Sequence, residues 1–129
     1  MTIEKVREIL EAEVITGADN LKMKVKVGCA ADLMSDILAF AEPEALLLTG
    51  LTNLQVVHTA EMSDIKAICF VRGKKPDEST VKLAEGKNLP LLTTHLPMFE
   101  SCGRLYKAGL VGLGYLDITK KNDRIQEIY

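Results

Sequence analysis

The strongest constraint on the fold is a repeat of about 22 residues in the second part of the chain. Apolar runs occupy residues 45–49, 67–71 and 89–93, and each is followed by a turn and a segment of helical length. Strands and helices that alternate at this spacing form right-handed crossovers, which place the strands parallel in one sheet. Runs that are apolar at every position indicate strands buried on both faces. We therefore expect a single α/β domain with a mainly parallel sheet flanked by helices.

Chain length and composition exclude several other classes of protein. The 129 residues suffice for one domain, and 47% hydrophobic with 26% charged residues excludes disorder over most of the length. No apolar run approaches the roughly 18 residues that a membrane-spanning helix needs, and the N-terminus has no apolar signal core. Three cysteines without a C-x-x-C motif predict reduced thiols. We expect a cytoplasmic protein with no membrane partner.

The first part of the chain predicts two helices and two strands. Residues 2–11 have the amphipathic pattern of a helix, and residues 13–16 that of a short strand. Residues 22–27 alternate between lysines and apolar side chains, which predicts a half-buried strand at an edge of the sheet. Residues 32–41 form a further helical pattern that ends before Pro43. Its predicted buried face comprises Leu33, Ile37, Phe40 and Ala41.

The end of the chain has the weakest pattern. We expect residues 1–110 to form the α/β domain, and residues 111–129 to be a C-terminal extension that packs on the same domain or on a dimer partner. The apolar run of residues 110–116 is compatible with a short strand or a hairpin arm. The polar residues 119–124 are typical of a turn.

The sequence lacks the phosphate-binding loop of kinases and NTPases. That loop has the pattern G-x-x-x-x-G-K-[ST], and neither Gly73-Lys74 nor Gly86-Lys87 has the other residues that it requires. No arrangement typical of a nucleophilic enzyme is present, and the candidate metal ligands have no standard spacing. These candidates are His58, His95 and Cys102. We therefore expect no metal, no cofactor and no catalytic residue.

Charge is distributed unevenly along the chain, although the net charge is only −2. Residues 1–64 carry 5 basic and 11 acidic side chains, whereas residues 65–129 carry 11 basic and 7 acidic ones. The small net charge gives no general attraction to nucleic acid. The uneven distribution has three interpretations: chance variation, complementary surfaces on two subunits, or an anion site in the second half.

One group of residues has the chemistry of an anion site for a nucleotide or another phosphorylated metabolite. Arg72, Lys74 and Lys75 follow a buried strand, where the carboxyl ends of parallel strands meet the N-termini of helices. Cations, helix N–H groups and hydroxyls at such an edge bind phosphate or carboxylate, whereas the alternative interpretation is a solvated basic turn. The candidate ligand-binding residues are Thr49, Gly50, Thr52, Asn53, Arg72, Gly73, Lys74, Lys75, Thr93 and Thr94.

Three stretches of the sequence resemble the DRTGG domain family: residues 46–53, 67–77 and 88–94. The segment that precedes them fits the family's entry into its first major helix, so the likeness extends over residues 1–110. The resemblance implies an α/β fold similar to the N-terminal domain of HPr serine kinase/phosphorylase. The sequence has no counterpart of the kinase domain of that enzyme.

The motif that gives the family its name is altered. Residues 50–53 read Gly-Leu-Thr-Asn where Gly-Asp-Arg-Thr is usual, and residues 71–73 read Val-Arg-Gly where Thr-Gly-Gly is usual. Ligand roles of the missing side chains therefore do not carry over to this chain. The turn and helix-start residues do carry over, and they are Gly50, Gly73, Pro76 and Asp77.

The resemblance implies a role in regulation and in subunit contacts, often as a homodimer, because in the family the catalytic machinery lies in another domain. We therefore expect a non-catalytic regulatory or ligand-sensing domain that is not an HPr kinase by itself. Two other interpretations stay open. One is a pure interaction subunit with an unknown protein partner, for example in a redox or hydrogenase system. The other is a small enzyme that uses residues 72–75 and 93–95 on a phosphorylated metabolite.

Overall fold

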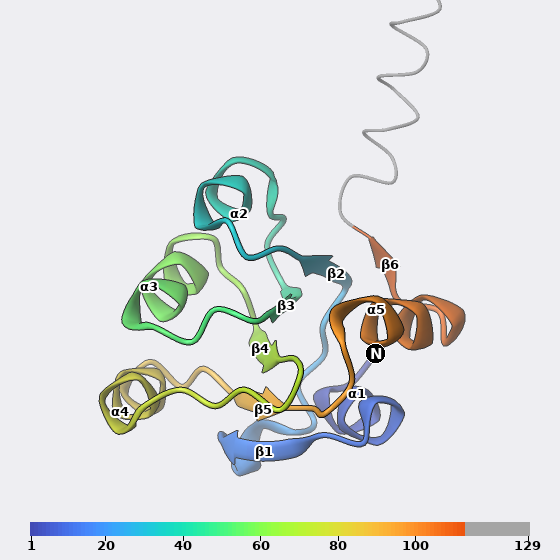
Figure 1. Ribbon diagram of the computed structural model, residues 1–129, viewed down its shortest axis with the longest axis horizontal. Coiled ribbons are helices and arrows are strands. Elements are labelled where there is room, and N and C mark those ends of the chain that lie inside the picture. Colours follow the sequence, from blue (N-terminus) through green and yellow to red (C-terminus); the bar gives the residue numbers. More distant parts are fainter. Residues whose placement is uncertain (113–129) are drawn as a thin grey trace, which may run out of the picture.

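A six-stranded sheet between two layers of helices makes up the part of the chain that the computed structural model describes, residues 1–112 (Figure 1). The elements in chain order are α1 (Ile3–Leu10), β1 (Glu13–Thr16), a single 3₁₀ turn (Ala18–Asn20), β2 (Val27–Ala30), α2 (Met34–Phe40), β3 (Ala45–Thr49), α3 (Leu54–Met62), β4 (Ala67–Phe70), α4 (Glu78–Gly86), β5 (Leu91–Thr93), α5 (Met98–Lys107) and β6 (Val111–Gly112).

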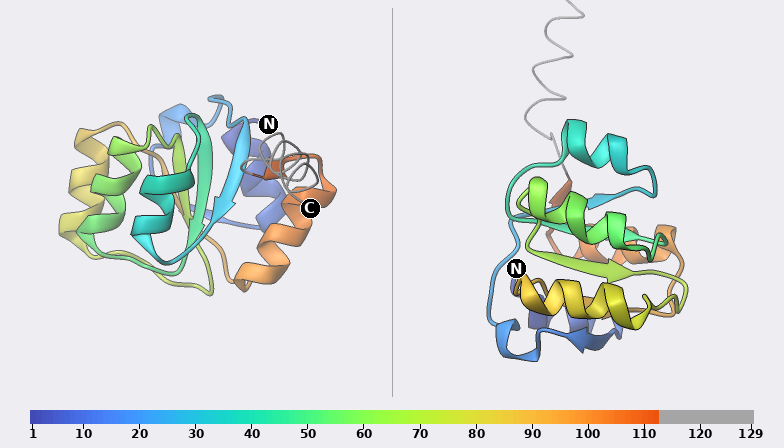
Figure 2. Two further views of the ribbon diagram at one scale, coloured as in Figure 1. Left: turned by 90° about the horizontal axis from the view of Figure 1, so that it is seen from above. Right: turned by 90° about the vertical axis from the view of Figure 1, so that its left-hand side faces the viewer.

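The sheet has the order β1-β5-β4-β3-β2-β6, and every neighbouring pair except β1 and β5 is parallel. The chain advances one strand at a time from β2 to β5, with α2, α3 and α4 on one face of the sheet. It then returns along the other face through α5, which packs beside α1, and reaches β6 at the opposite edge (Figure 2). The predicted α/β fold with a mainly parallel sheet is confirmed.

The central strands contribute to two hydrophobic layers, one on each face. All five residues of β3 are buried; Leu47 packs with α2 and α3, whereas Leu46 and Leu48 pack with α1 and α5. In β4, Phe70 belongs to the first layer and Cys69 to the second. Because side chains alternate across a sheet that is covered on both faces, these strands need an apolar residue at every position.

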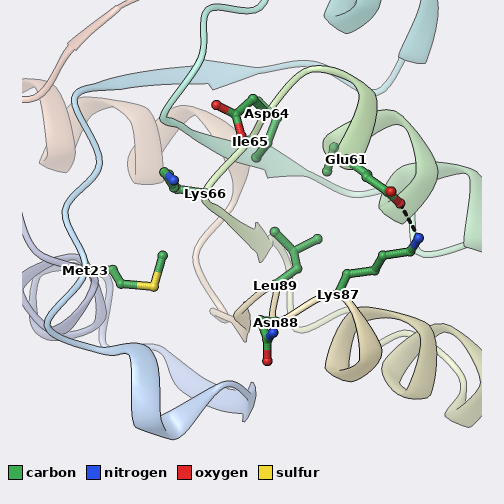
Figure 3. A pocket seen from close by; sticks show the side chains of 9 residues that line it. Met23, Glu61, Asp64, Ile65, Lys66, Lys87, Asn88 and Leu89 are labelled. Carbon is green, nitrogen blue, oxygen red and sulfur yellow. Dashed lines mark ion pairs between the residues drawn. The ribbon is translucent and has the colours of Figure 1, made fainter.

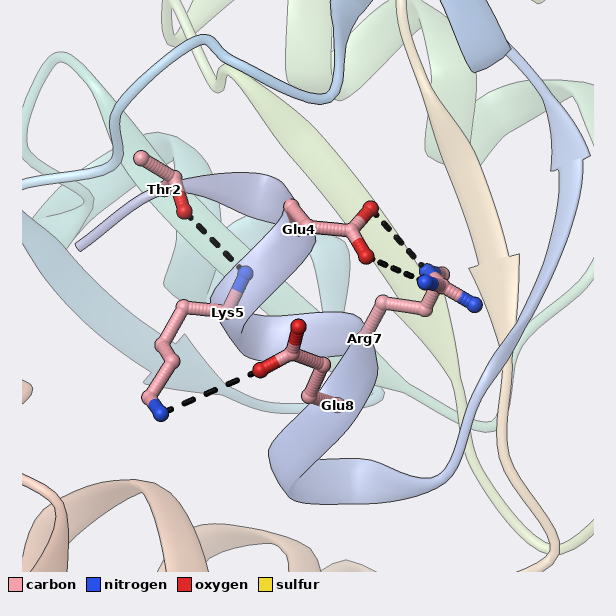
Figure 4. A network of polar contacts seen from close by, with 5 residues as sticks. All are labelled: Thr2, Glu4, Lys5, Arg7 and Glu8. Carbon is pink, nitrogen blue, oxygen red and sulfur yellow. Dashed lines mark hydrogen bonds and ion pairs between the residues drawn. The ribbon is translucent and has the colours of Figure 1, made fainter.

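The helix predicted at residues 2–11 is present as α1. The Thr2 hydroxyl caps it by accepting a hydrogen bond from the Lys5 N–H at 3.1 Å (Figure 4). On the exposed side, Glu4 pairs with Arg7 one turn away. The predicted apolar face is fully buried and comprises Ile3, Val6 and Leu10.

Residues 22–27 do not form the predicted edge strand. The strand is β2, which begins only at Val27 and lies inside the sheet, between β3 and β6. The residues before it run beside the start of α1, where the Val25 N–H donates to the Met1 carbonyl at 2.8 Å. Val25 is buried in the layer that contains α1. The alternating burial therefore results from packing against a helix, which the sequence pattern does not distinguish from packing in a sheet.

The buried face predicted for residues 32–41 is partly wrong. α2 begins at Met34 and buries Met34 and Ile37, whereas Leu33 and Phe40 are 61% and 63% exposed. α2 lies at the end of its helix layer and packs against α3 on one side (Figure 1). Only a narrow face of the helix is therefore covered, and a helical period alone does not show how wide that face is.

Residues 113–129 lie outside the described part of the chain, and they contain most of the predicted C-terminal extension and of the apolar run of residues 110–116. Within residues 1–112, no helix is long and apolar enough to cross a membrane.

Candidate anion site at the carboxyl ends of the strands

The candidate anion-site residues all lie along one edge of the sheet, where β3, β4 and β5 end. Because these strands are parallel neighbours, their carboxyl ends and the loops that follow them lie side by side. Thr49 ends β3, Arg72 and Lys74 follow β4, and Thr93 ends β5. Residues 52 and 53 directly precede α3. The fold therefore brings residues separated by more than forty positions to a common edge.

The basic turn after β4 is held by the backbone of the loop after β5. Arg72 and Gly73 have φ angles of 61° and 70°, and the Lys74 N–H donates to the Val71 carbonyl at 3.2 Å. Two consecutive left-handed residues with this bond form a type I′ turn. The N–H groups of Arg72 and Gly73 donate to carbonyls of residues 96 and 94 at 2.9 and 2.7 Å. Ligand contact at this turn therefore depends on the exposed side chains of Arg72 and Lys74.

The hydroxyls at the end of β5 hold neighbouring segments in place. Thr93 is buried, and its hydroxyl donates to the Lys74 carbonyl at 2.8 Å. This hydrogen bond holds the basic turn against the end of β5. Thr94 donates to the Leu10 carbonyl at 2.6 Å and accepts from the Leu96 N–H at 3.2 Å. Both hydroxyls therefore position the loops around the candidate site.

Asp32 is a member of this edge that the candidate set does not contain. One oxygen of its carboxylate, Oδ1, accepts hydrogen bonds from the Thr49 hydroxyl at 3.0 Å and the Gly50 N–H at 2.8 Å. A carboxylate of the protein itself thus occupies two donors that we assigned to an external anion. The strand order would have indicated this contact, because Asp32 follows β2 and β2 pairs with β3.

The start of α3 lies between a carboxylate, that of Asp32, and the side chain of Lys74. Its N-cap residue, Asn53, makes no side-chain capping bond, and no acidic residue lies in its first turn. The side chain of Lys74 passes close to the preceding loop, since a Cβ at Gly50 would lie 3.9 Å from its Cδ. The start of α4 differs, because Asp77 caps it by accepting from the Thr80 N–H at 2.9 Å.

Lys75 points toward β1 rather than toward α3. Its ammonium group lies 3.4 Å from the carboxylate of Glu13, and both side chains are exposed. His95 lies on the other side of the turn, with Nδ1 3.3 Å from where a Cβ of Gly73 would be. The structure therefore separates Lys75 from Lys74 and brings a histidine next to the turn.

Five surface hollows lie elsewhere on residues 1–112, and none of them is lined by Arg72, Lys74 or Lys75. One of about 230 Å³ lies before β4 and β5, at the opposite ends of the strands (Figure 3). Lys87 and Glu61 form an ion pair at 2.7 Å on its wall. The two cations of the candidate anion site, Arg72 and Lys74, are both exposed to solvent.

Burial affects the three cysteine thiols to different degrees. It raises the pKa of both Cys29 and Cys69 to about 12, and it also raises that of Cys102. Thiolates are scarce at neutral pH when the pKa is this high, so the thiols of Cys29 and Cys69 are unreactive. Among the described residues, no three His, Cys, Asp or Glu side chains are grouped as a metal site.

Comparison with known proteins identifies a family and solved structures of similar fold. Residues 5–108 match the model of the DRTGG domain. The solved structure of the CBS and DRTGG domains of the regulatory region of Clostridium perfringens pyrophosphatase, complexed with its activator diadenosine tetraphosphate, is similar in fold, with a TM-score of 0.64 at 14% identity. The similarity covers 81% of this chain and 45% of that one, so this chain spans less than half of its neighbour's length. No curated protein matches the sequence.

Proposed function

The chain belongs to the DRTGG domain family, and on this premise we propose that it is a non-catalytic regulatory domain that senses a nucleotide or another phosphorylated metabolite. The family match over residues 5–108 is the observation that carries the proposal. The similar regulatory region of the pyrophosphatase, which binds a nucleotide activator, supports it.

We place the phosphate of the ligand between the basic turn and the start of α3. Lys74 and Arg72 would supply cations, and the uncapped N–H groups at Asn53 would face the same anion. A charge-assisted hydrogen bond contributes about 1.5–3 kcal/mol before solvent competition. Because the site is open, we expect affinities in the micromolar to millimolar range, weakened by salt.

Thermal-shift measurements test the ligand proposal. Inorganic phosphate, ATP and diadenosine tetraphosphate are the probes, each titrated to millimolar concentration. We expect at least one to raise the melting temperature, and Arg72→Gln and Lys74→Gln to reduce that shift. Lys22→Gln is the matched control, because it removes the same charge from an exposed lysine before β2. The proposal is wrong if no probe shifts the melting temperature, or if the control reduces the shift equally.

The proposal includes the absence of kinase activity. Without a phosphate-binding loop, the chain should neither hydrolyse ATP nor phosphorylate HPr. Incubation with labelled ATP and HPr measures this directly, and phosphoserine on HPr above background would contradict it. The three unpaired thiols support a cytoplasmic location, which is also part of the proposal.

A second candidate function is that of an interaction subunit, and we propose a homodimer in either case. The exposed apolar side chains at and before the start of α2 and within it support it, since Leu33, the N-cap residue, and Leu38 are 61% and 49% exposed. Light scattering after gel filtration should give about twice the chain mass of 14.2 kDa. A monomer at tens of micromolar would contradict the homodimer. A dimer that binds none of the phosphate probes would favour the interaction subunit.

A further inference from the structure

A histidine lies beside the basic turn that follows β4. The imidazole of His95 approaches Gly73 so closely that a Cβ at this glycine would lie 3.3 Å from Nδ1 and 3.8 Å from Cε1. In the chain, Gly73 stands between Arg72 and Lys74, and the side chains of Arg72, Lys74 and His95 are all exposed. The fold therefore brings an imidazole next to the two cations of the candidate anion site.

Backbone hydrogen bonds hold the histidine at this place. The Gly73 N–H donates to the Thr94 carbonyl at 2.7 Å, and the Arg72 N–H donates to the Leu96 carbonyl at 2.9 Å. His95 is the residue between these two acceptors, so its backbone is held against the turn on both sides. The glycine permits this approach, because it has a φ of 70° and no side chain that would meet the imidazole.

The three side chains have no partner in the part of the chain that the structure describes. Within residues 1–112, the side chains of Arg72, Lys74 and His95 take part in no hydrogen bond and no ion pair. The carboxylate of Asp32 lies beside Gly50, as the Cδ of Lys74 does, and it accepts from the Gly50 N–H at 2.8 Å. A positive charge on the imidazole would thus lie next to two cations, which is unfavourable unless an anion binds there.

Acidic residues on the elements around the turn are engaged elsewhere. Their partners are Lys75 for Glu13 before the end of β1, Arg104 for Glu11 after α1, and the Thr80 N–H for Asp77 before α4. Glu100, in the first turn of α5, is exposed to solvent. The positive charge around His95 is therefore available to a ligand.

We propose that His95 is a further anion-binding residue, and that its protonated imidazole binds a phosphate or sulfate group together with Arg72 and Lys74. The inference rests on the proposed function, because it adds a residue to the same site. An imidazolium donates hydrogen bonds from both ring nitrogens and carries a positive charge, whereas the neutral ring has one donor and no charge. Histidine changes its charge between about pH 5 and 8, so the site should bind these anions more tightly at the acid end of this range.

Sulfate is the probe that isolates the titration of the protein, since its charge is constant in this range, whereas phosphate itself changes charge. We expect the native chain to bind sulfate about five-fold more tightly at about pH 5.5 than at about pH 8, measured by calorimetric titration. His95→Gln should bind sulfate weakly and equally at both pH values. His58→Gln is the matched control, because His58 is the other histidine of the chain and lies exposed on α3. It should keep the pH dependence of the native chain.

Two further readouts separate direct binding from a structural role of the histidine. His95→Lys keeps a positive charge at both pH values, so at about pH 8 it should bind sulfate more tightly than His95→Gln does. Sulfate binding near neutral pH should also take up protons, which titrations in buffers of different ionisation enthalpy measure. We expect this uptake in the native chain and in His58→Gln, and none in His95→Gln.

The outcomes distinguish this inference from the proposed function. Sulfate affinity that is equal at both pH values, or whose pH dependence persists in His95→Gln, overturns the role of His95 and leaves the proposed function standing. Loss of the pH dependence in His58→Gln as well overturns it too. If sulfate, inorganic phosphate and the nucleotide probes all fail to bind at either pH, the proposed function and this inference are both wrong.

Discussion

Asp32 connects the stability of the loop after β3 with the electrostatics of the candidate site. Its carboxylate binds the Thr49 hydroxyl and the Gly50 N–H, so it stabilises the path from β3 into α3. The same negative charge lies near the side chain of Lys74, which also contacts the Gly50 position. Asp32 therefore favours the folded loop and opposes the approach of an external anion.

Replacement of Asp32 by asparagine separates these two effects. Asp32→Asn keeps an acceptor oxygen but removes the charge, so we expect a loss of about 1 kcal/mol in the free energy of unfolding, because hydrogen bonds to a charged acceptor are stronger. We also expect inorganic phosphate to bind several-fold more tightly. Urea unfolding and calorimetric titration measure the two quantities. Weaker phosphate binding would instead mean that Asp32 matters mainly because it holds the loop after β3 in place.

The capping residue of α4 makes stability depend on pH. Hydrogen bonds from the Thr80 backbone N–H at 2.9 Å and from the Ser79 hydroxyl at 3.0 Å lower the pKa of the Asp77 carboxyl from its ordinary value of 3.8. A pKa that is lower in the folded state stabilises the fold above the ordinary value, and this contribution is lost as the pH falls through the folded-state pKa. The urea midpoints of the native chain and of Asp77→Asn should therefore differ at neutral pH and converge as the pH falls through the folded-state pKa of Asp77. A difference independent of pH would contradict the assignment.

Single residues show why the candidate site was only partly predictable. The pattern of buried strands places Thr93 and Thr94 at the carboxyl end of β5, where both lie. It does not show that Thr94 donates to Leu10, which is 84 positions away. Periodicity indicates the edge at which a polar side chain lies. Whether its donor is already used depends on tertiary contacts that one sequence does not display.

Helix ends in this fold use left-handed residues that are not glycine. Asp64 after α3 and Asn88 after α4 both have a φ of 54°, and Glu11 after α1 has a φ of 50°. At the same place after α5 stands Gly109, with a φ of 109°. A residue other than glycine costs free energy in this left-handed conformation. The ends of α1, α3 and α4 are therefore less stable than they would be with glycine at these positions.

Asn88→Gly should stabilise the protein. The N–H of Leu89 closes the end of α4 by donating to the Ala84 carbonyl at 2.9 Å, and glycine permits the same geometry without strain. We expect a gain of roughly 0.5 kcal/mol in the free energy of unfolding, measured by urea denaturation. Gly109→Ala is the complementary variant and should reduce stability. No change in either variant would show that the backbone relaxes at these ends.

Helices and strands that pack mainly against their neighbours in the chain were easier to predict than those that pack against distant segments. β3 and β4 are buried along their whole length. They are covered on one face by the helices that adjoin them in the chain and on the other by the layer of α1 and α5, so both of their faces are apolar and the two strands were predicted. β2 and α2 depend on distant neighbours: α1 buries Val25, and α2 meets only one neighbouring helix in its layer. A local pattern therefore gave the wrong start for β2 and the wrong face for part of α2.

At the scale of the whole molecule, the uneven charge along the sequence does not become two charged halves. The sheet places β1 of the acidic half beside β5 of the basic half. Among residues 1–112, three ion pairs join the two halves: Lys75 with Glu13, Lys87 with Glu61, and Arg104 with Glu11. These contacts within one molecule weaken the argument that the charge distribution serves contacts between subunits. No local sequence pattern predicts that β1 pairs antiparallel with β5, or that the chain returns to form β6 at the opposite edge of the sheet.

A homodimer of this chain should therefore persist at high salt. If its interface is apolar, as the exposed side chains of α2 suggest, screening of charges leaves the association unchanged or strengthens it. Light scattering in 0.1 M and about 1 M NaCl should give the same mass. Dissociation at the higher salt would show that charged residues hold the two subunits together.

The two helix layers also differ in how far apart along the chain their parts lie. The layer of α2, α3 and α4 comes from consecutive units, whereas α1 and α5 meet only when the ends of the described chain come together, as in the contact of Glu11 with Arg104. Contacts between nearby residues form first because they close shorter loops. We expect the β2–β5 core to form early in folding and the α1–α5 layer to dock last. In native-state hydrogen exchange, the amides of α1 and α5 should then open together, before those of β3 and β4.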